Sequence, residues 1–258
     1  MENNSCKDTF SFYRRIAPGE EKVHGVQTFQ GKLSHNMDIK VVVWENEFNY
    51  SKLNNFGVQF ATGKYYIFLN NDVEMIGTDW ILRLSGDCHR NKVGVTGVKL
   101  YYPDDTVQHA GIVIGIGGSK RGIAANMFQG LPREEHGYQN RASLQADYSA
   151  VTAACMMVKK DVFDAVDGFT EKLQVAFNDV DFCLKVRKKG YLVMYDPKIE
   201  GYHYESKSRG AEDTPEKVRR FQGEIDTFRV LWKDILKDGD PYYNRNFSLV
   251  SNQYLLGK

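Results

Sequence analysis

The stretch Tyr65-Tyr66-Ile67-Phe68-Leu69-Asn70-Asn71-Asp72 decides the fold. Its first five residues form a continuous apolar run, which is typical of a strand covered on both faces. An earlier strand is expected at 39–44, and a helix at 51–62 with Ser51 as its N-cap and Gly63 as its stop. A further helix is expected from about Asp79 to Arg90. This alternation indicates an α/β fold with parallel strands joined by right-handed crossovers.

Three polar residues, Asn70, Asn71 and Asp72, stand where the apolar run ends. In open α/β sheets, ligands bind beyond the carboxyl ends of the strands. A carboxylate there suits Mg²⁺ or Mn²⁺, which prefer oxygen ligands and keep one or two protein carboxylates beside phosphates and water. The same residues also favour a simple turn, so the motif alone leaves both interpretations open.

The rest of the chain predicts a mixed sheet in one domain, 1–258, without linkers or repeats. The segments 93–102 and 107–114 are strand-like, and Pro103-Asp104-Asp105 between them is a turn signal. A polar segment without clear periodicity reaches about Gln145, and such a long loop is usually functional or mobile. The remaining elements expected are a core segment at 148–159, helices at 160–166, 178–189 and 214–236, and a strand at 191–195.

A second acidic motif, Phe177-Asn178-Asp179-Val180-Asp181-Phe182, opens the helix expected at 178–189. Asn178 is a suitable N-cap, and the helix dipole favours acids in the first turn, which by itself explains both aspartates. The functional interpretation is that Asp179 or Asp181 accepts a proton from an attacking hydroxyl. A helix N-terminus would then keep the pKa of this base low.

His203 lies in an aromatic, strand-like stretch. A histidine there is usually a core or hydrogen-bonding residue, but a neutral imidazole could also complete a Mn²⁺ shell. Ser206, Lys207 and Arg209 follow, and they could hold a diphosphate or form a solvated loop. His109 could face an active site or simply pack.

Composition narrows the class of protein. The formal charge of +1 gives no general reason to expect nucleic acid as a partner. The four cysteines are scattered without a CxxC pair, which favours a reducing cytosol. No apolar stretch reaches the roughly 18 residues of a membrane span, and the polar N-terminus is unlike a signal peptide. A cytoplasmic protein is therefore expected.

Together these motifs resemble family 2 glycosyltransferases, which are inverting, Rossmann-like nucleotide-diphospho-sugar transferases with a GT-A fold. The resemblance is closest to bacterial members that build cell-surface polysaccharides such as rhamnose-containing ones, and it runs from about Asp38 to Trp232. The stretches that carry it are 48–55, 68–72, 100–104, 108–111, 148–155, 177–184 and 203–210.

The resemblance implies roles for residues of this chain. Asn70, Asn71 and Asp72 match the DxD-type site, so Asp72 would bind the metal and the donor diphosphate, with Asn70 in the place of the first acid. Asp179 would be the base in preference to Asp181, His203 would be a metal ligand, and Arg209 would contact the donor. The segment 148–154 would line the acceptor side, and 119–145 could close over the donor.

The implied reaction transfers a hexosyl or deoxyhexosyl group from a nucleotide-diphosphate sugar to a hydroxyl of a glycan or lipid-linked acceptor. It would use Mn²⁺ or Mg²⁺ and serve polysaccharide biosynthesis for the cell wall or surface. Peripheral contact with the inner face of the plasma membrane is compatible with it. A metal-dependent phosphoesterase would want a denser cluster of His and Asp ligands.

The chain departs from the family pattern at its start. Glu2-Asn3-Asn4-Ser5 resembles the tail of the family's second strand, and a strand-helix-strand segment of about 35 residues that precedes it is absent. Residues 1–37 are thus atypical, and 214–258 form a C-terminal helix and tail. Loss of those elements would impair donor binding, so a truncated, non-catalytic relative that acts as a binding or scaffolding module is the alternative.

Overall fold

The fold is known from a computed structural model, which describes residues 2–3, 7–23, 26–32, 37–117, 122–204 and 214–257. The chain forms two compact units, Met1–Ala61 and Thr62–Lys258, and each is described by itself. The arrangement of the whole chain as one domain stays a prediction.

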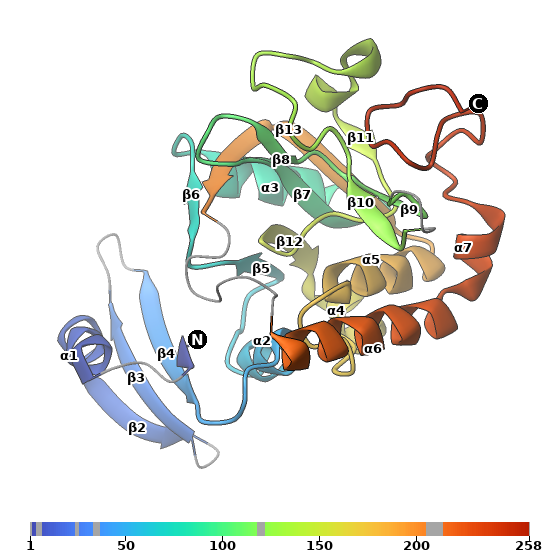
Figure 1. The fold of residues 1–258 in the computed structure, drawn as a ribbon. Coiled ribbons are helices and arrows are strands. Elements are labelled where there is room, and N and C mark those ends of the chain that lie inside the picture. Colours follow the sequence, from blue (N-terminus) through green and yellow to red (C-terminus); the bar gives the residue numbers. More distant parts are fainter. Residues whose placement is uncertain are drawn as a thin grey trace. The chain divides into compact units, whose positions relative to one another are not determined.

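The first unit is a small sheet with two helices. Its elements are β1 (Glu2–Asn3), α1 (Lys7–Ile16), β2 (Gly19–Val23), β3 (Val26–Lys32), β4 (Asp38–Trp44) and α2 (Tyr50–Val58) (Figure 1). The strand order is β1-β4-β3-β2, with β1 parallel to β4 and the other pairs antiparallel. Ala17, Phe29, Val41 and Val43 form its core because alternate residues of β3 and β4 point to one face.

Two predictions for α2 are wrong. Its N-cap is Asn49, whose backbone is extended and whose side chain accepts a hydrogen bond from the Lys52 amide at 2.9 Å. Ser51 therefore lies inside the first turn. The helix ends at Val58 and not at Gly63, because the Phe60 amide already bonds the Gly57 carbonyl in a tighter turn.

The second unit is built on a mixed sheet, as predicted. The order is β11-β13-β7-β12-β5, with β6 paired to β13 and β8 to β7. β12 is antiparallel to both β5 and β7, and β13 is parallel to β7, so β5, β7 and β13 run in one direction. The strands are β5 (Tyr65–Leu69), β6 (Val73–Met75), β7 (Val93–Tyr101), β8 (Val107–His109), β9 (Ile112–Ile114), β10 (Ala124–Asn126), β11 (Ala146–Asp147), β12 (Cys155–Lys159) and β13 (Leu192–His203).

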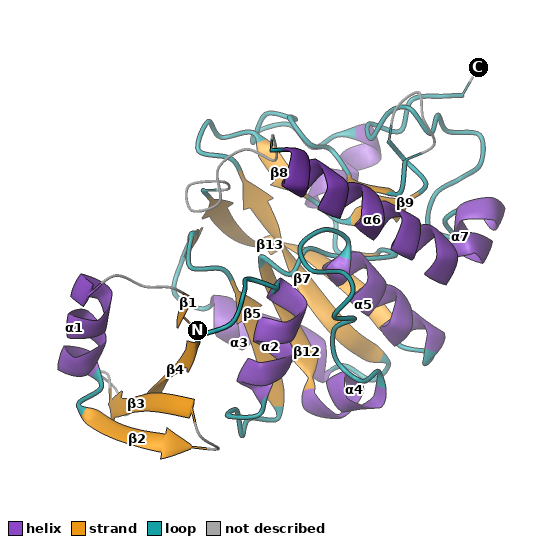
Figure 2. Ribbon diagram, turned by 60° about the horizontal axis from the view of Figure 1, so that its bottom comes forward, coloured by secondary structure: helices purple, strands orange, loops and turns teal. Residues whose placement is uncertain are grey.

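Helices pack against this sheet (Figure 2). α3 lies against β7 and β12, and α5 against β13 and β7. Leu84 and Cys88 of α3 meet Val98, Leu100 and other apolar residues in one buried cluster. The helices are α3 (Trp80–His89), a 3₁₀ segment (Tyr138–Ser143), α4 (Lys160–Ala165), α5 (Asn178–Lys188), α6 (Pro215–Leu231) and α7 (Lys233–Asp238).

The segment 119–145 differs from the predicted structureless loop. Residues 118–121 lie outside the described part, but 122–145 contain β10 and the 3₁₀ segment, and Met127 and Phe128 are fully buried. β5 also differs, since its residues alternate between more and less buried positions and it stands at one end of the strand order. One face of β5 is thus more deeply buried than the other.

The strand predicted at 191–195 is much longer. β13 continues through Pro197 to His203 because its register against β7 shifts between Asp196 and Glu200, and a bulge tolerates the missing proline amide. The helix predicted at 214–236 is interrupted at Trp232, which separates α6 from α7. The extension of β13 is what brings His203 to the site described below.

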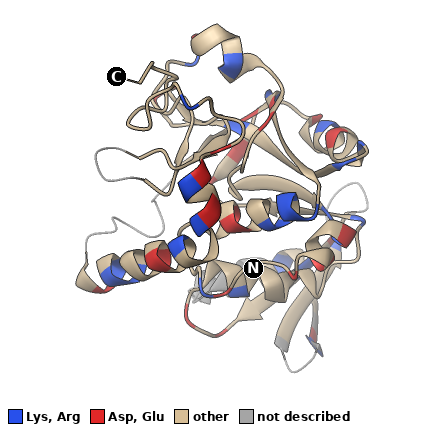
Figure 3. Ribbon diagram, turned by 90° about the vertical axis from the view of Figure 1, so that its right-hand side faces the viewer, with Lys and Arg blue, Asp and Glu red and all other residues tan. Residues whose placement is uncertain are grey.

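Two surface properties complete the description. None of the helices in the described ranges combines the length and the apolar character that crossing a bilayer requires. Lys and Arg are interspersed with Asp and Glu along the ribbon, in keeping with the formal charge of +1 (Figure 3).

Candidate functional site

Asp72 and His203 lie together although 130 residues separate them in the chain. After β5 the backbone turns, with the Val73 amide donating to the Asn70 carbonyl at 3.3 Å. β6 then pairs with the end of β13 so that Val73 stands opposite His203. Asp72 Oδ1 comes to 3.2 Å from His203 Nε2. The turn predicted after the apolar run is therefore present, and the two residues predicted as metal ligands lie side by side.

A glutamine fixes the tautomer of His203. Gln108 Nε2 donates to the His203 carbonyl oxygen at 3.2 Å, which orients the amide so that its Oε1 faces His203 Nδ1 at 2.7 Å. Since Oε1 only accepts, Nδ1 carries the proton in the neutral imidazole. Nε2 is then left with a lone pair directed toward Asp72. A neighbouring hydrogen-bonded group that sets ring orientation in this way is a common feature of metal-ligating histidines.

This arrangement fits a divalent cation. Asp72 Oδ1 is buried and accepts no hydrogen bond from the described residues, and it faces the Nε2 lone pair of His203. Two acceptors at this separation are satisfied by a proton on Nε2 or by a cation bound beside them, and a carboxylate oxygen with an imidazole nitrogen is a donor set that suits Mn²⁺. Asn70 Nδ2 lies 3.3 Å from the same Nε2 and supplies a weak donor.

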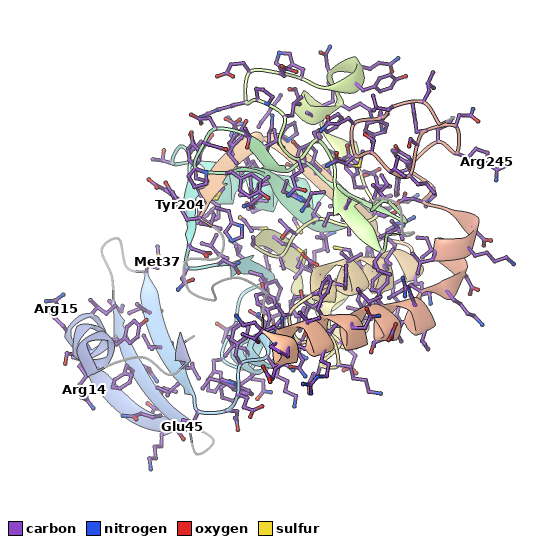
Figure 4. The ribbon with its side chains drawn as sticks, in the orientation of Figure 1. Arg14, Arg15, Met37, Glu45, Tyr204 and Arg245 are labelled. Carbon is purple, nitrogen blue, oxygen red and sulfur yellow. The ribbon has the colours of Figure 1, made fainter. Side chains whose placement is uncertain are left out.

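The other residues predicted for donor binding have different positions. Asn71 is exposed in the turn after β5. Arg209, with Ser206 and Lys207, lies outside the described residues. Tyr204, labelled in Figure 4, borders the site. Its amide donates to the Asp72 carbonyl at 2.9 Å, and its hydroxyl donates to Glu74 Oε2 at 3.0 Å.

Asp179 is a partly buried carboxylate in the first turn of α5. Its Oδ2 accepts from the Ala153 amide at 3.2 Å, and its Oδ1 from the Val180 amide at 2.8 Å. Burial raises the pKa of Asp179 above its usual 3.8, while the backbone donors of Ala153 and Val180 and the Thr152 hydroxyl oppose that rise. The expectation of a lowered pKa is wrong because desolvation outweighs the helix N-terminus here.

Asp181 has a different environment. It is 1% exposed, its Oδ2 accepts from the Thr170 hydroxyl at 2.6 Å, and its Oδ1 accepts from the Trp232 indole at 2.8 Å. Lys185 Nζ is 3.8 Å from the same Oδ2. Both carboxylate oxygens are thus used to join α5 to neighbouring elements, which leaves Asp179 as the candidate base.

The N-terminus of α5 is not capped as predicted. Asn178 lies inside the helix and donates from Nδ2 to the Val175 carbonyl at 3.0 Å, and the flanking residue is Phe177 in a left-handed conformation. The amides of Val175 and Ala176 donate instead to the buried carboxylate of Glu224, at 2.7 and 3.3 Å. A long-range acid from α6 therefore orders the approach to Asp179.

His109 packs within the protein. It is 1% exposed, its Nδ1 lies 2.6 Å from Asn126 Oδ1, and its Nε2 accepts weakly from the amides of Gly111 and Thr152 at 3.4 Å. Burial lowers the pKa of His109 to about 4, so the imidazole is neutral at physiological pH. This resolves the open choice between packing and facing the site in favour of packing.

One backbone segment links these groups. The Thr152 amide contacts His109, the Ala153 amide bonds Asp179, and the Ala154 carbonyl accepts from the Asn70 amide at 2.9 Å. Asn70 in turn contacts His203. The candidate base and the candidate metal ligands are therefore anchored to neighbouring residues at the start of β12. Sequence reasoning missed this role and that of Gln108, because both depend on register between distant strands.

Two further observations bound the site. In the part of the chain that the structure describes, no group of three His, Cys, Asp or Glu side chains forms a metal-type cluster, so the dense ligand set of a phosphoesterase is not seen. A cavity of about 1090 Å³ lies elsewhere, lined by residues such as Ile114, Arg229, Lys237 and Tyr243, and none of the candidate site residues borders it.

Comparisons with known proteins agree on the class of fold. No family model matches the chain. An uncharacterised protein of Sinorhizobium fredii, y4gI, is 46% identical over 84% of this chain, which is 24% of that protein. The O-antigen biosynthesis protein RfbC of Myxococcus xanthus is 33% identical over 81% of this chain, or 16% of its own length. The chain thus spans about a quarter or less of the curated relatives that it matches.

Among solved structures, the crystal structure of GalNAc-T7 with UDP, GalNAc and Mn²⁺ superposes with a TM-score of 0.53. The match covers 76% of this chain and 37% of that one at 14% identity, which is a likeness of fold. The mixed sheet flanked by helices belongs to that architecture. The chain therefore has the GT-A fold of glycosyltransferases.

Proposed function

We propose that this chain is the catalytic part of a glycosyltransferase that moves a sugar from a nucleotide-diphosphate sugar to an acceptor hydroxyl, with inversion at the anomeric carbon. The observation that carries the proposal is the fixed tautomer of His203, whose Nε2 lone pair faces the buried Asp72 Oδ1 at 3.2 Å. Asp179 accepts a hydrogen bond from the Ala153 amide, close in sequence to the Ala154 carbonyl that accepts from the Asn70 amide.

Asp179 acts as the base in this proposal. Its raised pKa makes it a stronger base than an exposed aspartate, while the amides of Ala153 and Val180 still favour the ionised form. It takes the proton of the acceptor hydroxyl, and the oxygen forms a bond to the anomeric carbon as the bond to the diphosphate breaks on the opposite face. The proton ends on Asp179, and the electron pair leaves with the diphosphate.

Asp72 and His203 would hold Mn²⁺ or Mg²⁺. When bound, the cation supplies charge neutralisation for the leaving diphosphate. Asn70 orients the ligand pair through its contact with His203 Nε2, and Gln108 keeps that nitrogen unprotonated. Arg209, carried over from the resemblance, would add a donor contact.

The acceptor is proposed to be a glycan or lipid-linked saccharide approached along 148–154. The similarity to a protein named for O-antigen biosynthesis supports a role in polysaccharide synthesis. Hexosyl or deoxyhexosyl transfer, and a cytoplasmic location at the inner face of the plasma membrane, extend the same proposal.

The test is a thermal-shift titration of residues 1–258 with UDP, dTDP and GDP, each with and without Mn²⁺, followed by turnover assays with the matching nucleotide sugars. We expect one nucleotide to raise the melting temperature only with Mn²⁺, and Asp72→Ala to abolish the shift. Asp226→Ala, at an exposed acid on α6, is the matched control.

Two outcomes would change the conclusion. Metal-dependent binding without turnover for any acceptor would favour the alternative of a non-catalytic binding or scaffolding module. A cooperative melt that no nucleotide shifts, with or without Mn²⁺, would contradict donor binding by this chain altogether.

A further inference from the structure

A second, smaller pocket lies in the second unit away from the candidate site. Its volume is about 280 Å³. The strands β7 and β13 form its floor, and the segment 133–143 borders it. The residues that line it and matter here are Lys99, Tyr101, Arg133, His136, Ser143 and Glu200. The proposed transfer reaction uses none of them.

Lys99 is the unusual residue in this pocket. It is only 3% exposed in the middle of a sheet, and its ammonium group has no hydrogen-bond or ion-pair partner among the side chains that the structure describes. Its Nζ lies 5.2 Å from the centre of the Tyr101 ring, which offers a face of negative charge but no lone pair. Burial lowers the pKa of Lys99, and the charge of the nearby Glu200 opposes this shift only in part.

A second cation stands on the same ring. Arg133 Cζ is 4.8 Å from the Tyr101 centre, and its guanidinium is held by the Tyr202 hydroxyl at 2.8 Å and by Glu200 at 3.5 Å. The charge of Arg133 further lowers the pKa of Lys99. Two cations share one aromatic ring, and of the two only Arg133 is held by an acid within ion-pair distance.

Two acids line the pocket, Glu200, which is engaged, and Glu134, which is exposed at its rim. Glu200 accepts from the Tyr101 hydroxyl through Oε1 and faces Arg133 through Oε2. His136 Nδ1 and the Ser143 hydroxyl bond each other at 2.8 Å. No acid of the described residues comes within ion-pair distance of the Lys99 ammonium, which therefore has three donors to offer.

We propose that this pocket binds a carboxylate or phosphate group carried on a ligand of about monosaccharide size. An oxyanion would accept from Lys99 and from the free donors of Arg133 in charge-assisted hydrogen bonds. Hydroxyl groups beside it would donate to Glu200. The volume lies just below the roughly 300–1,000 Å³ of pockets for drug-sized ligands, so a nucleotide is too large and a single acidic sugar unit fits.

The experiment uses the wild-type chain and three probes, glucuronate, inorganic phosphate and glucose. Lysine side chains are labelled with ¹³C, and the Lys99 signal is assigned by its loss in Lys99→Met. We expect glucuronate or phosphate to shift the Lys99 signal in a saturable manner and to raise its pKa, and glucose, which lacks the charge, to have no effect. Glucuronate alone would indicate a sugar carboxylate, and phosphate alone a phosphate group.

Binding is then compared between Lys99→Met and Lys198→Met, which removes an exposed lysine next to the pocket. Loss of one charge-assisted contact is expected to weaken binding about 10-fold or more in Lys99→Met and to leave Lys198→Met unchanged. Since methionine fills the same buried space, the variant is expected to fold. Equal binding to both variants, or no saturation by either anion up to about 10 mM with an unmoved Lys99 signal, would overturn the proposal.

Discussion

His203 and Gln108 are joined by two hydrogen bonds, one from the Gln108 amide to the His203 carbonyl at 3.2 Å and one between Nδ1 and Oε1 at 2.7 Å. These hydrogen bonds act as a lock on the neutral tautomer of His203 that carries its proton on Nδ1. The Nε2 lone pair then faces Asp72, which is the arrangement proposed above to bind a metal ion.

Gln108→Leu should weaken Mn²⁺ binding about 10- to 100-fold, because the imidazole then loses the acceptor that holds its proton on Nδ1. Isothermal titration with Mn²⁺ measures the effect, and a fluorescence melt shows whether the fold is kept. Gln129→Leu, at an exposed amide that bonds the Tyr102 hydroxyl, is the control. An unchanged Mn²⁺ affinity in Gln108→Leu would show that the lock has no bearing on metal binding.

Asp179→Asn should lower kcat by about 10²- to 10⁴-fold, as expected when a general base is removed. The amide keeps the shape of the carboxylate, so nucleotide binding should change little. Its Nδ2 cannot accept from the Ala153 or the Val180 amide, so the melting temperature should fall modestly. Steady-state kinetics with saturating donor and acceptor give kcat, and thermal shift gives donor binding. If kcat stays within a few fold of wild type, Asp179 is not the base.

Asp181→Ala should behave in the opposite way. It leaves the Trp232 indole and the Thr170 hydroxyl without their acceptor and removes the ion-pair partner of Lys185, which still donates to the Gly168 carbonyl. The expected cost is about 2–4 kcal/mol of the free energy of unfolding. Urea denaturation followed by tryptophan fluorescence measures it, with Asp226→Ala as an exposed control. A variant as stable as wild type but without turnover would return Asp181 to the list of candidate bases.

Asp87 should make stability depend on pH. Burial, and next the adjacent Asp196, raise the pKa of Asp87 to about 6 from 3.8. Between these values the folded state binds more protons than the unfolded state, so the free energy of unfolding falls as pH rises from about 4 to above 6. Asp87→Asn removes this dependence and should exceed wild type by about 1 kcal/mol above pH 7, allowing for solvent screening.

The control for Asp87 is Asp164→Asn, at an exposed acid paired with Lys160. It should lose a few tenths of a kcal/mol at neutral pH rather than gain stability. Urea denaturation at pH 4, 6 and 8 checks both variants. If the difference between Asp87→Asn and wild type is the same at all three pH values, the raised pKa is not linked to folding.

Local patterns predicted most elements correctly. The apolar run of β5, the turn at Pro103 and the helices α3 and α5 follow from periodicity and turn chemistry that short windows contain. The juxtaposition of Asp72 and His203 also agrees with what the motifs implied. The chemistry that these residues perform stays a prediction.

The errors arise where distant residues decide. Asn178 is a residue type that commonly caps helices, but here the carboxylate of Glu224 from α6 accepts the hydrogen bonds of the nearby Val175 and Ala176 amides. Pro197 argues against a strand, yet a register shift against β7 lets β13 pass through it and reach His203. The pKa of Asp179 was misjudged for the same reason, since desolvation depends on what packs around the helix N-terminus.

Ala153 and Ala154 hold the site through one main-chain amide and one carbonyl, and their side chains contribute little more than small size. Contacts of this kind place a demand on backbone shape and room, and almost none on side-chain identity. Related chains can therefore carry other amino acids at these positions and keep the geometry, provided that no proline removes an amide and no bulky side chain is introduced. In distant relatives, this part of the site would therefore be the first to differ in amino-acid sequence and the last to differ in backbone structure.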